Sequence, residues 1–269
     1  MPAPVNGFKV ALAQGSVQIG LWLALANAYS AEICSGAGYD WLLIDGEHAP
    51  NDIASVLAQL QALKGSGSHA VVRPPMAEPW LLKQILDLGV QSLLIPMIES
   101  GAQARATVKA VRYPPQGIRG IGAALARASA FNGIPDYLQT ANDEICLLLQ
   151  IESQVGLMAL DEISTTDGVD GVFIGPADLA ADMGFIGQPG AAAVRDAVDS
   201  ALRRVRSHGR PAGVLTSDLS LARHYRETGA NFIAIGSDVA LLSGSAARRL
   251  QDFLDPQSSQ PASPSPAAY

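Results

Sequence analysis

The chain has 269 residues, of which 48% are hydrophobic and 16% charged, and its net charge is −7. This is the composition of a globular protein, and a single large α/β barrel domain uses about 250 residues. The acidic balance argues against nucleic acid as a partner, because phosphate binding requires clustered lysine and arginine. No run approaches about 18 uncharged apolar residues, and the N-terminus is a poor signal peptide, so the expected location is the cytoplasm, with no membrane span.

Short apolar runs alternate with longer amphipathic stretches along the chain. The apolar runs lack polar alternation, as strands that are covered on both faces should. The expected strands are Ile19–Ala24, Trp41–Ile44, Ala70–Arg73, Ser92–Ile95, Ile145–Ile151, Gly171–Ile174, Pro211–Leu215 and Phe232–Ile235. The expected helices are Ser30–Gly36, Asp52–Lys64, Glu78–Leu88, Gly101–Val111, Val155–Ile163, Ala191–Ser207, Leu219–Thr228 and Ser245–Leu254.

Glycines give the stop signals of several of these helices, at Gly65, Gly89, Gly209 and Gly229. Repeated strand-then-helix units in a chain of this length predict one closed (β/α)₈ barrel over residues 1–254. Two segments break the pattern. Residues 112–144 form an insertion too long for an idle connection, and the Pro/Ser/Ala-rich residues 255–269 are expected to be disordered.

Polar residues follow many of the expected strands. In a (β/α)₈ barrel the chemistry takes place at the C-terminal ends of the strands, so these residues are candidates for the site. The polar candidates are Asp45, Glu47, His48, Arg73, Glu99, Gln150, Glu152, Asp178, Thr216 and Asp238, and the apolar Trp22 and Leu215 belong to the same rim. Any one of the polar groups could merely cap a helix, but so many groups on one rim favour a catalytic site.

Glu152 and Asp178 follow neighbouring strands, so their carboxylates are expected to meet. A divalent cation would relieve their repulsion, and two protein ligands would leave coordination positions for water and substrate, as Mg²⁺ or Mn²⁺ prefers. Backbone N–H groups near Ala177 and Asp178, at a helix start marked by Pro176, would suit a substrate carboxylate.

The lysines argue for metal catalysis over a Schiff base. A Schiff-base aldolase needs a lysine at the rim, whereas Lys9 lies in the N-terminal segment and Lys64, Lys83 and Lys109 lie on expected outer helices. His48 can act as a general base near neutral pH, and Arg73 can stabilise an enolate or carboxylate. The alternative interpretations are a structural loop histidine and a surface ion pair.

Long motifs in the chain resemble the HpcH/HpaI aldolase family. They are GLWLALANAYSAEICSGAGYDWLLIDGEHAPND, VVRPP, LLIPMIES, RYPPQGIRGIGAALARAS, NDEICLLLQIES and DGVDGVFIGPADLAADMG, and the likeness runs from about Gly20 to Leu250. It implies a barrel of the phosphoenolpyruvate/pyruvate type and a class II pyruvate aldolase. The motifs are most similar to those of members that cleave 4-hydroxy-2-oxoheptanedioate to pyruvate and succinate semialdehyde.

The resemblance also implies roles for individual residues. It makes Glu152 and Asp178 the ligands of a divalent cation, such as Mg²⁺, Mn²⁺ or Co²⁺. The pyruvate-binding positions are Gln150, Ala177 and Asp178, Arg73 stabilises the transition state, His48 is the base, and Asp87 raises its basicity. Small-molecule 2-keto acids and aldehydes are the implied substrates, and the implied assembly is a hexamer with the site near a subunit interface.

The position of Asp87 conflicts with its implied role if a single subunit forms the site. It ends the third expected helix, just before strand four, and so belongs to the barrel face opposite the rim that carries His48. The length of a strand, roughly 15–20 Å, would separate the two side chains. We therefore expect Asp87 to act on a neighbouring subunit, or else to be a solvated residue without this role.

Three other functions remain open. A 2-keto-3-deoxy sugar-acid aldolase, of the rhamnonate or glucarate type, would need the same cation site and differ only in its distal pocket. A phosphate-binding barrel isomerase is disfavoured because Asp218 and Asp238 fall in the loops that would hold phosphate. A catalytically inactive barrel would be expected to lose Glu152, Asp178 or Arg73, and all three are present.

Overall fold

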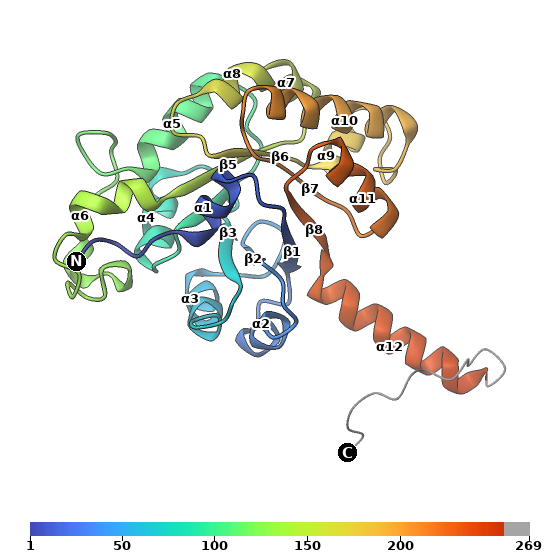
Figure 1. Cartoon of the computed structure of the whole chain (residues 1–269). Helices are drawn as coiled ribbons and strands as arrows, with labels where there is room; N and C mark the ends of the chain where they lie inside the picture. The colour runs from blue at the N-terminus through green and yellow to red at the C-terminus, as the bar shows by residue number, and fades with distance from the viewer. Residues whose placement is uncertain (256–269) are drawn as a thin grey trace.

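Eight parallel strands, each paired with the next and the last with the first, close into a barrel in the computed structural model of the protein (Figure 1). The structure describes residues 1–255. The strands are β1 (Gln18–Leu23), β2 (Trp41–Asp45), β3 (His69–Arg73), β4 (Ser92–Ile95), β5 (Cys146–Ile151), β6 (Gly171–Ile174), β7 (Ala212–Leu215) and β8 (Phe232–Ser237). The predicted (β/α)₈ barrel is therefore confirmed, and the predicted strand ends are correct to within two residues. The expected tail at 255–269 lies outside the described residues, apart from Asp255.

Helices surround the barrel, and the insertion at 112–144 also contains short 3₁₀ turns. The helices are α1 (Gly7–Ala13), α2 (Ala28–Ser35), α3 (Ile53–Ala62), α4 (Pro79–Asp87), α5 (Gly101–Val111), α6 (Tyr137–Thr140), α7 (Gln154–Met158), α8 (Leu160–Thr165), α9 (Pro176–Asp182), α10 (Ala192–Ser207), α11 (Leu219–Thr228) and α12 (Asp238–Leu254). The 3₁₀ turns are η1 (Ala123–Leu125), η2 (Arg127–Ser129) and η3 (Ala141–Glu144). None of the helices in this described part of the chain is long and apolar enough to cross a bilayer.

Two helical predictions need correction, and α1, which precedes the barrel, was not among the expected helices. The expected helix Val155–Ile163 is two helices, α7 and α8, because the backbone at Ala159 turns out of helical geometry. The expected helix Ser245–Leu254 is only the second half of α12, which begins at Asp238 under a cap from the Ser237 side chain to the Ala240 N–H. Gly244 hid the first half, because glycine is a poor helix former.

The interior of the barrel is packed with aromatic rings, and α1 closes its N-terminal end. Phe8 of α1 is fully buried, with its ring centroid 5.8 Å from that of Trp41 and 6.4 Å from that of Phe232. One layer further up, the rings of Trp22 and Phe173 lie 5.6 Å apart. The barrel is thus a filled core with a closed lower end, and any cavity has to lie above Trp22 and Phe173, at the C-terminal ends of the strands.

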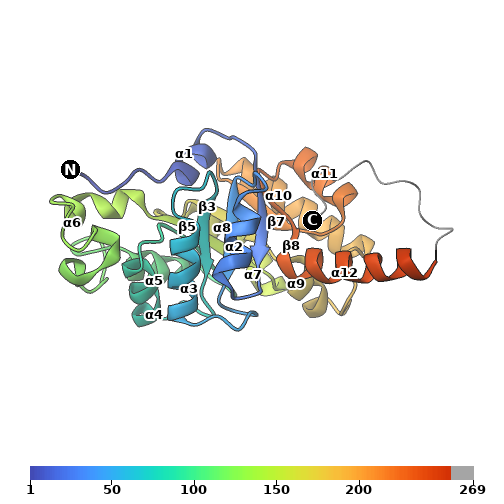
Figure 2. The same cartoon turned by 90° about the horizontal axis from the view of Figure 1, so that it is seen from below.

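Helix α12 leaves the barrel instead of packing along it. Figures 1 and 2 show it extending away from β8, on the side of the molecule opposite the insertion at 112–144. Of its residues only Asp238 is buried, and its carboxylate accepts the N–H groups of Ala24 (2.8 Å) and Leu25 (3.2 Å) after β1. Apolar residues follow one another at helical spacing along the exposed part of α12, namely Val239, Leu242, Ala246, Leu250 and Phe253. We call this set the α12 stripe.

Candidate active site

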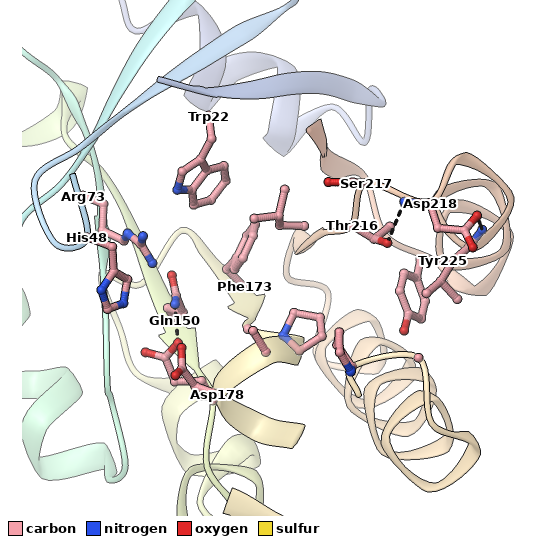
Figure 3. Close-up of a pocket in the computed structure, with 18 residues that line it drawn as sticks. Trp22, His48, Arg73, Gln150, Phe173, Asp178, Thr216, Ser217, Asp218 and Tyr225 are labelled. Carbon is pink, nitrogen blue, oxygen red and sulfur yellow. Dashed lines mark hydrogen bonds between the residues drawn. The ribbon is translucent and has the colours of Figure 1, made fainter. Parts of the chain in front are cut away.

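A cavity of about 540 Å³ opens at the C-terminal ends of the strands, with Trp22 and Phe173 among its lining residues (Figure 3). It brings together most of the residues that the sequence singled out. Those that line it are His48, Arg73, Gln150, Glu152, Ala177 and Asp178. Of the proposed site residues, only Asp87 lies elsewhere.

The two candidate cation ligands reach the cavity from adjacent strands. Glu152 follows β5 and Asp178 lies in the first turn of α9 after β6, and these strands pair through Ile151 and Ile174. Glu152 is only 3% exposed, whereas Asp178 is open to solvent. Burial raises the pKa of the Glu152 carboxyl, against hydrogen bonds from Gln150 and Met97 that lower it, and the nearby Glu47 and Asp178 carboxylates raise it further.

Two donors hold the Glu152 carboxylate in place. The Gln150 side-chain amide donates to Oε2, and the Met97 backbone N–H donates to Oε1 at 2.9 Å. Met97 achieves this with a left-handed backbone (φ 56°), an uncommon conformation for a residue with a side chain. The sequence analysis did not find Met97, because neither its type nor its spacing signals a backbone donor.

Arg73 is held by two carboxylates that follow β2. Its Nε and Nη2 donate to the two oxygens of Asp45 at 2.9 and 2.7 Å, and its Nη1 lies 2.8 Å from Oε2 of Glu47. Asp45 and Arg73 are paired in the β2–β3 register, and both are buried. Arg73 is therefore no surface ion pair, and its guanidinium faces the cavity (Figure 3).

His48 lies at the mouth of the cavity, on the turn that follows β2. Its side chain is 65% exposed, and its Nε2 is 3.8 Å from Oε2 of Glu47. An accessible imidazole with no stronger contact in the described chain can accept a proton from a substrate in the cavity. Its role as the base stays a prediction.

Asp87 is separated from His48 within the subunit, as its position in the sequence suggested. It ends α4, away from the cavity, where its Oδ1 accepts a hydrogen bond from Nη2 of Arg119 at 2.6 Å. Arg119 is fully buried and stacks over the ring of Tyr113, 4.3 Å from its centroid. Asp87 stays partly exposed beside the insertion, so a second subunit could reach it.

The outer part of the cavity is lined by residues that the strand-end rule did not select. They are Pro189, Gly190, Leu221 and Tyr225, which join Leu215, Thr216, Ser217 and Asp218. Leu221 and Tyr225 come from α11, and Pro189 and Gly190 from the loop before α10, so no position after a strand marks them. The carboxylate of Asp218 caps α11 by accepting the N–H groups of Ser220 and Leu221. No cation other than Arg73 and no lysine lines this cavity in the part of the chain that the structure describes.

The donors present fit a divalent cation that keeps most of its coordination sphere for other ligands. Residues 1–255 contain no group of three or more His, Cys, Asp or Glu side chains arranged to enclose a metal. Glu152 and Asp178 instead offer oxygen ligands from one side, beside an open cavity, which suits a hard cation that also binds water and substrate. Gly175 leaves room for the Glu152 carboxylate, because a Cβ there would lie 2.7 Å from Oε2.

This close approach makes Gly175→Ala informative. The added methyl group would push Glu152 away from Gln150, so we expect affinity for Mn²⁺ and turnover to fall at least about 10-fold while the barrel stays folded. Mn²⁺ titration and circular dichroism measure the two effects. Gly184→Ala is the control at a glycine with nothing within 4 Å, although its positive φ of 85° will cost some stability. Unchanged Mn²⁺ affinity in Gly175→Ala would contradict the proposed role of the space that Gly175 leaves for the Glu152 carboxylate.

Comparisons with known proteins agree with this fold and show the family of the chain. Residues 18–244 match the HpcH/HpaI aldolase/citrate lyase family. A hydroxypyruvate/pyruvate aldolase of Roseovarius nubinhibens is 58% identical over 93% of this chain and 97% of its own. A 4-hydroxy-2-oxo-heptane-1,7-dioate aldolase of Salmonella arizonae is 54% identical over 90% of this chain and 92% of its own. The crystal structure of an HpcH/HpaI aldolase/citrate lyase family protein from Burkholderia cenocepacia superposes with a TM-score of 0.90 at 39% identity, covering 93% of this chain and all of the other. The expected likeness to heptanedioate aldolases is therefore present, and that to the hydroxypyruvate/pyruvate aldolase is slightly greater.

Proposed function

As a member of the HpcH/HpaI aldolase/citrate lyase family, the chain is an aldolase, a carbon–carbon lyase, and we propose that it is a class II enzyme that cleaves 4-hydroxy-2-keto acids to pyruvate and an aldehyde. One observation carries this proposal. A single cavity collects two carboxylates, a buried arginine, an accessible histidine and a side-chain amide, and no lysine of residues 1–255 lines it. An imine mechanism has no residue to use there.

Glu152 and Asp178 would hold a divalent cation, such as Mg²⁺, Mn²⁺ or Co²⁺. When bound, the cation supplies Lewis acidity to the keto acid and a sink for the electrons that the broken bond releases. Gln150 and Met97 keep the Glu152 carboxylate oriented for this purpose. Gln150 and the backbone N–H groups of Ala177 and Asp178, at the start of α9, would bind the keto acid.

Arg73 and His48 supply the remaining chemistry. His48 takes the proton of the C4 hydroxyl, and the C3–C4 bond breaks to leave an aldehyde and the enolate of pyruvate. The guanidinium of Arg73 stabilises the negative charge that develops on the enolate oxygen. Protonation of C3, by the imidazolium or by water, then yields pyruvate and balances the reaction.

The outer cavity favours a neutral, hydroxylated aldehyde. Succinate semialdehyde carries a carboxylate at its far end, and within the described residues the cavity offers it Asp218 and no lysine or arginine other than Arg73. Thr216 and Ser217 can instead hydrogen-bond to hydroxyl groups. We therefore propose that the protein uses hydroxylated aldehydes, as aldolases of the sugar-acid type do. We also propose that hydroxypyruvate can replace pyruvate as the keto acid that forms the enolate, because a relative with 58% identity is a hydroxypyruvate/pyruvate aldolase.

Cation removal tests the reaction class. Exhaustive chelation is expected to abolish pyruvate release, because Glu152 and Asp178 alone cannot stabilise the enolate, and Mn²⁺, Co²⁺ or Mg²⁺ is expected to restore it. Borohydride added with pyruvate should leave the activity intact. Irreversible, pyruvate-dependent inactivation by borohydride would overturn the class II assignment.

The aldehyde is identified by comparing substrates with the same enzyme preparation. We expect a 2-keto-3-deoxy sugar acid to be cleaved with a higher kcat/KM than 4-hydroxy-2-oxoheptanedioate, each assayed with and without Mn²⁺. A clear preference for the heptanedioate would contradict our interpretation of Asp218 and would leave the class II mechanism in place.

We further propose that the protein is a homo-oligomer, in which α12 packs against a second copy. The α12 stripe is exposed along its whole length; Phe253, for example, is 82% exposed. Solitary exposed apolar residues are common, but a continuous row on a projecting helix marks a contact surface. The partly exposed Asp87 and the accessible His48 also suit a site that is completed between subunits, and the hexamer implied by the family resemblance would provide such interfaces.

A charge on the α12 stripe tests the assembly. Phe253→Glu is expected to weaken it, because the contact would have to bury an unpaired carboxylate. Gln251→Glu adds the same charge on another side of the helix and serves as the control. Light scattering coupled to size-exclusion chromatography measures the mass of each variant. If Phe253→Glu and Gln251→Glu have the same mass as the unmodified protein at every concentration, the proposed role of α12 is wrong.

A further inference from the structure

The carboxylate of Asp45 touches both the candidate transition-state arginine and the turn that carries the candidate base. We propose that Asp45 is a positioning residue, which aims Arg73 into the cavity and fixes the His48 turn to the same point. This inference rests on the proposed function and adds to it a residue that neither the motifs nor the comparisons assign.

The first contact of Asp45 is with the guanidinium of Arg73. The carboxylate of Asp45 accepts hydrogen bonds from Nε at 2.9 Å and from Nη2 at 2.7 Å. These two parallel bonds along one side of the guanidinium restrict its rotation. Nη1 lies 2.8 Å from Oε2 of Glu47 as an ion pair, without forming a hydrogen bond. A guanidinium has five N–H donors, so one on Nη2 and two on Nη1 are not used by Asp45. Nη1 and Nη2 form the tip of the side chain, which faces the cavity (Figure 3).

The second contact of Asp45 is with the turn after β2. Oδ1 of Asp45 also accepts the backbone N–H of Glu47 at 3.0 Å, and that of His48 lies 3.5 Å away. The backbone carbonyl of Asp45 accepts a hydrogen bond from the Asn51 side chain at 2.7 Å, which closes the turn at its other end. The position of His48 is thereby linked to that of Arg73 through one carboxylate.

The surroundings make this link rigid. Asp45 is 2% exposed and Arg73 is 7% exposed, so neither charge can turn to water without breaking the pair. The guanidinium carbon also lies 5.4 Å from the centroid of Trp22, which covers one face of the group. A guanidinium fixed in this way needs no rearrangement when charge develops in the transition state, which is the condition for strong electrostatic catalysis.

Asp45→Asn tests the proposal without changing the size of the side chain. The amide can still accept Nε–H and the turn N–H groups through its oxygen, but its NH₂ group would face Nη2, donor against donor. We expect kcat to fall about 100-fold, as when an aligned transition-state donor is lost, whereas the affinities for Mn²⁺ and pyruvate change less than about threefold. Asp238→Asn is the matched control, because Asp238 is also a buried carboxylate after a strand that accepts backbone N–H groups, from Ala24, Leu25 and Val239, yet it forms no ion pair with an arginine among residues 1–255.

The combination with Arg73→Ala separates positioning from a general structural role. If Asp45 acts through Arg73, the double variant Asp45→Asn/Arg73→Ala should be no slower than Arg73→Ala alone. The double variant also removes both buried charges together, so it tests the proposal even where Asp45→Asn alone unfolds. Losses that multiply, or an Asp45→Asn enzyme with unchanged kcat, would overturn the inference. A full rate in Arg73→Ala would instead overturn the role of Arg73 in the proposed function.

Discussion

Glu152→Gln is expected to abolish turnover, lowering kcat/KM at least about a thousandfold, together with high-affinity binding of Mn²⁺. The substitution keeps the size of the side chain and an oxygen for the Met97 N–H, but it removes the only buried carboxylate of the proposed ligand pair. Calorimetric titration with Mn²⁺ and a coupled assay of pyruvate release measure the two losses.

Glu99→Gln is the matched control for this variant. Glu99 follows the neighbouring strand β4 and accepts a hydrogen bond from the Ser153 hydroxyl at 2.6 Å, but it does not line the cavity. Its substitution should leave Mn²⁺ binding intact and change the rate little. Equal losses in the two variants would mean that the rim as a whole, and not a ligand at Glu152, accounts for the effect.

Mixing two impaired variants is expected to restore activity if the site is shared between subunits. In hybrid oligomers of His48→Ala and Asp87→Ala, the His48 of one subunit meets the Asp87 of the next at some interfaces. Random assembly should then return about a quarter of the native activity, since each of the two positions is native with a chance of one half. The measurement is pyruvate release after the variants have been dissociated together and reassembled.

Each variant, taken through the same treatment alone, controls for refolding and must stay inactive or impaired. Mass spectrometry of intact assemblies establishes that mixed oligomers have formed. If proven mixed oligomers show no recovery although Asp87→Ala alone is impaired, Asp87 acts through its own subunit, through its contact with Arg119.

The sequence was sufficient to predict the barrel because the signals for it are local. Strands that are covered on both faces appear as unbroken apolar runs. The helix-ending glycines also act locally, and Gly65, Gly89, Gly209 and Gly229 all adopt the positive φ that this role requires. The rule that the site lies at the C-terminal ends of the strands then selected His48, Arg73, Gln150, Glu152 and Asp178, which the structure places in one cavity.

Features that depend on contacts between distant segments could not be predicted in this way. The sequence identified Asp45 and Arg73 separately, but only the β2–β3 register shows that they are neighbours. In the same way, the amphipathic pattern of residues 245–254 indicates a helix and an apolar side, yet not whether that side faces its own barrel. The left-handed Met97 was hidden because backbone donors have no signature in side-chain chemistry.

The ring of Phe8, packed on Trp41 and Phe232, has a consequence for the order of events in catalysis. This packing closes the N-terminal end of the barrel, so substrates and products share one entrance at the C-terminal ends of the strands. In the proposed mechanism the keto-acid end of the substrate would bind at the closed end of the cavity, beside Gln150 and Glu152, with the aldehyde end toward the exposed Asp218. After cleavage the aldehyde would then leave first and pyruvate second. In the condensation direction the order would reverse, and an aldehyde that bound before pyruvate would block its access.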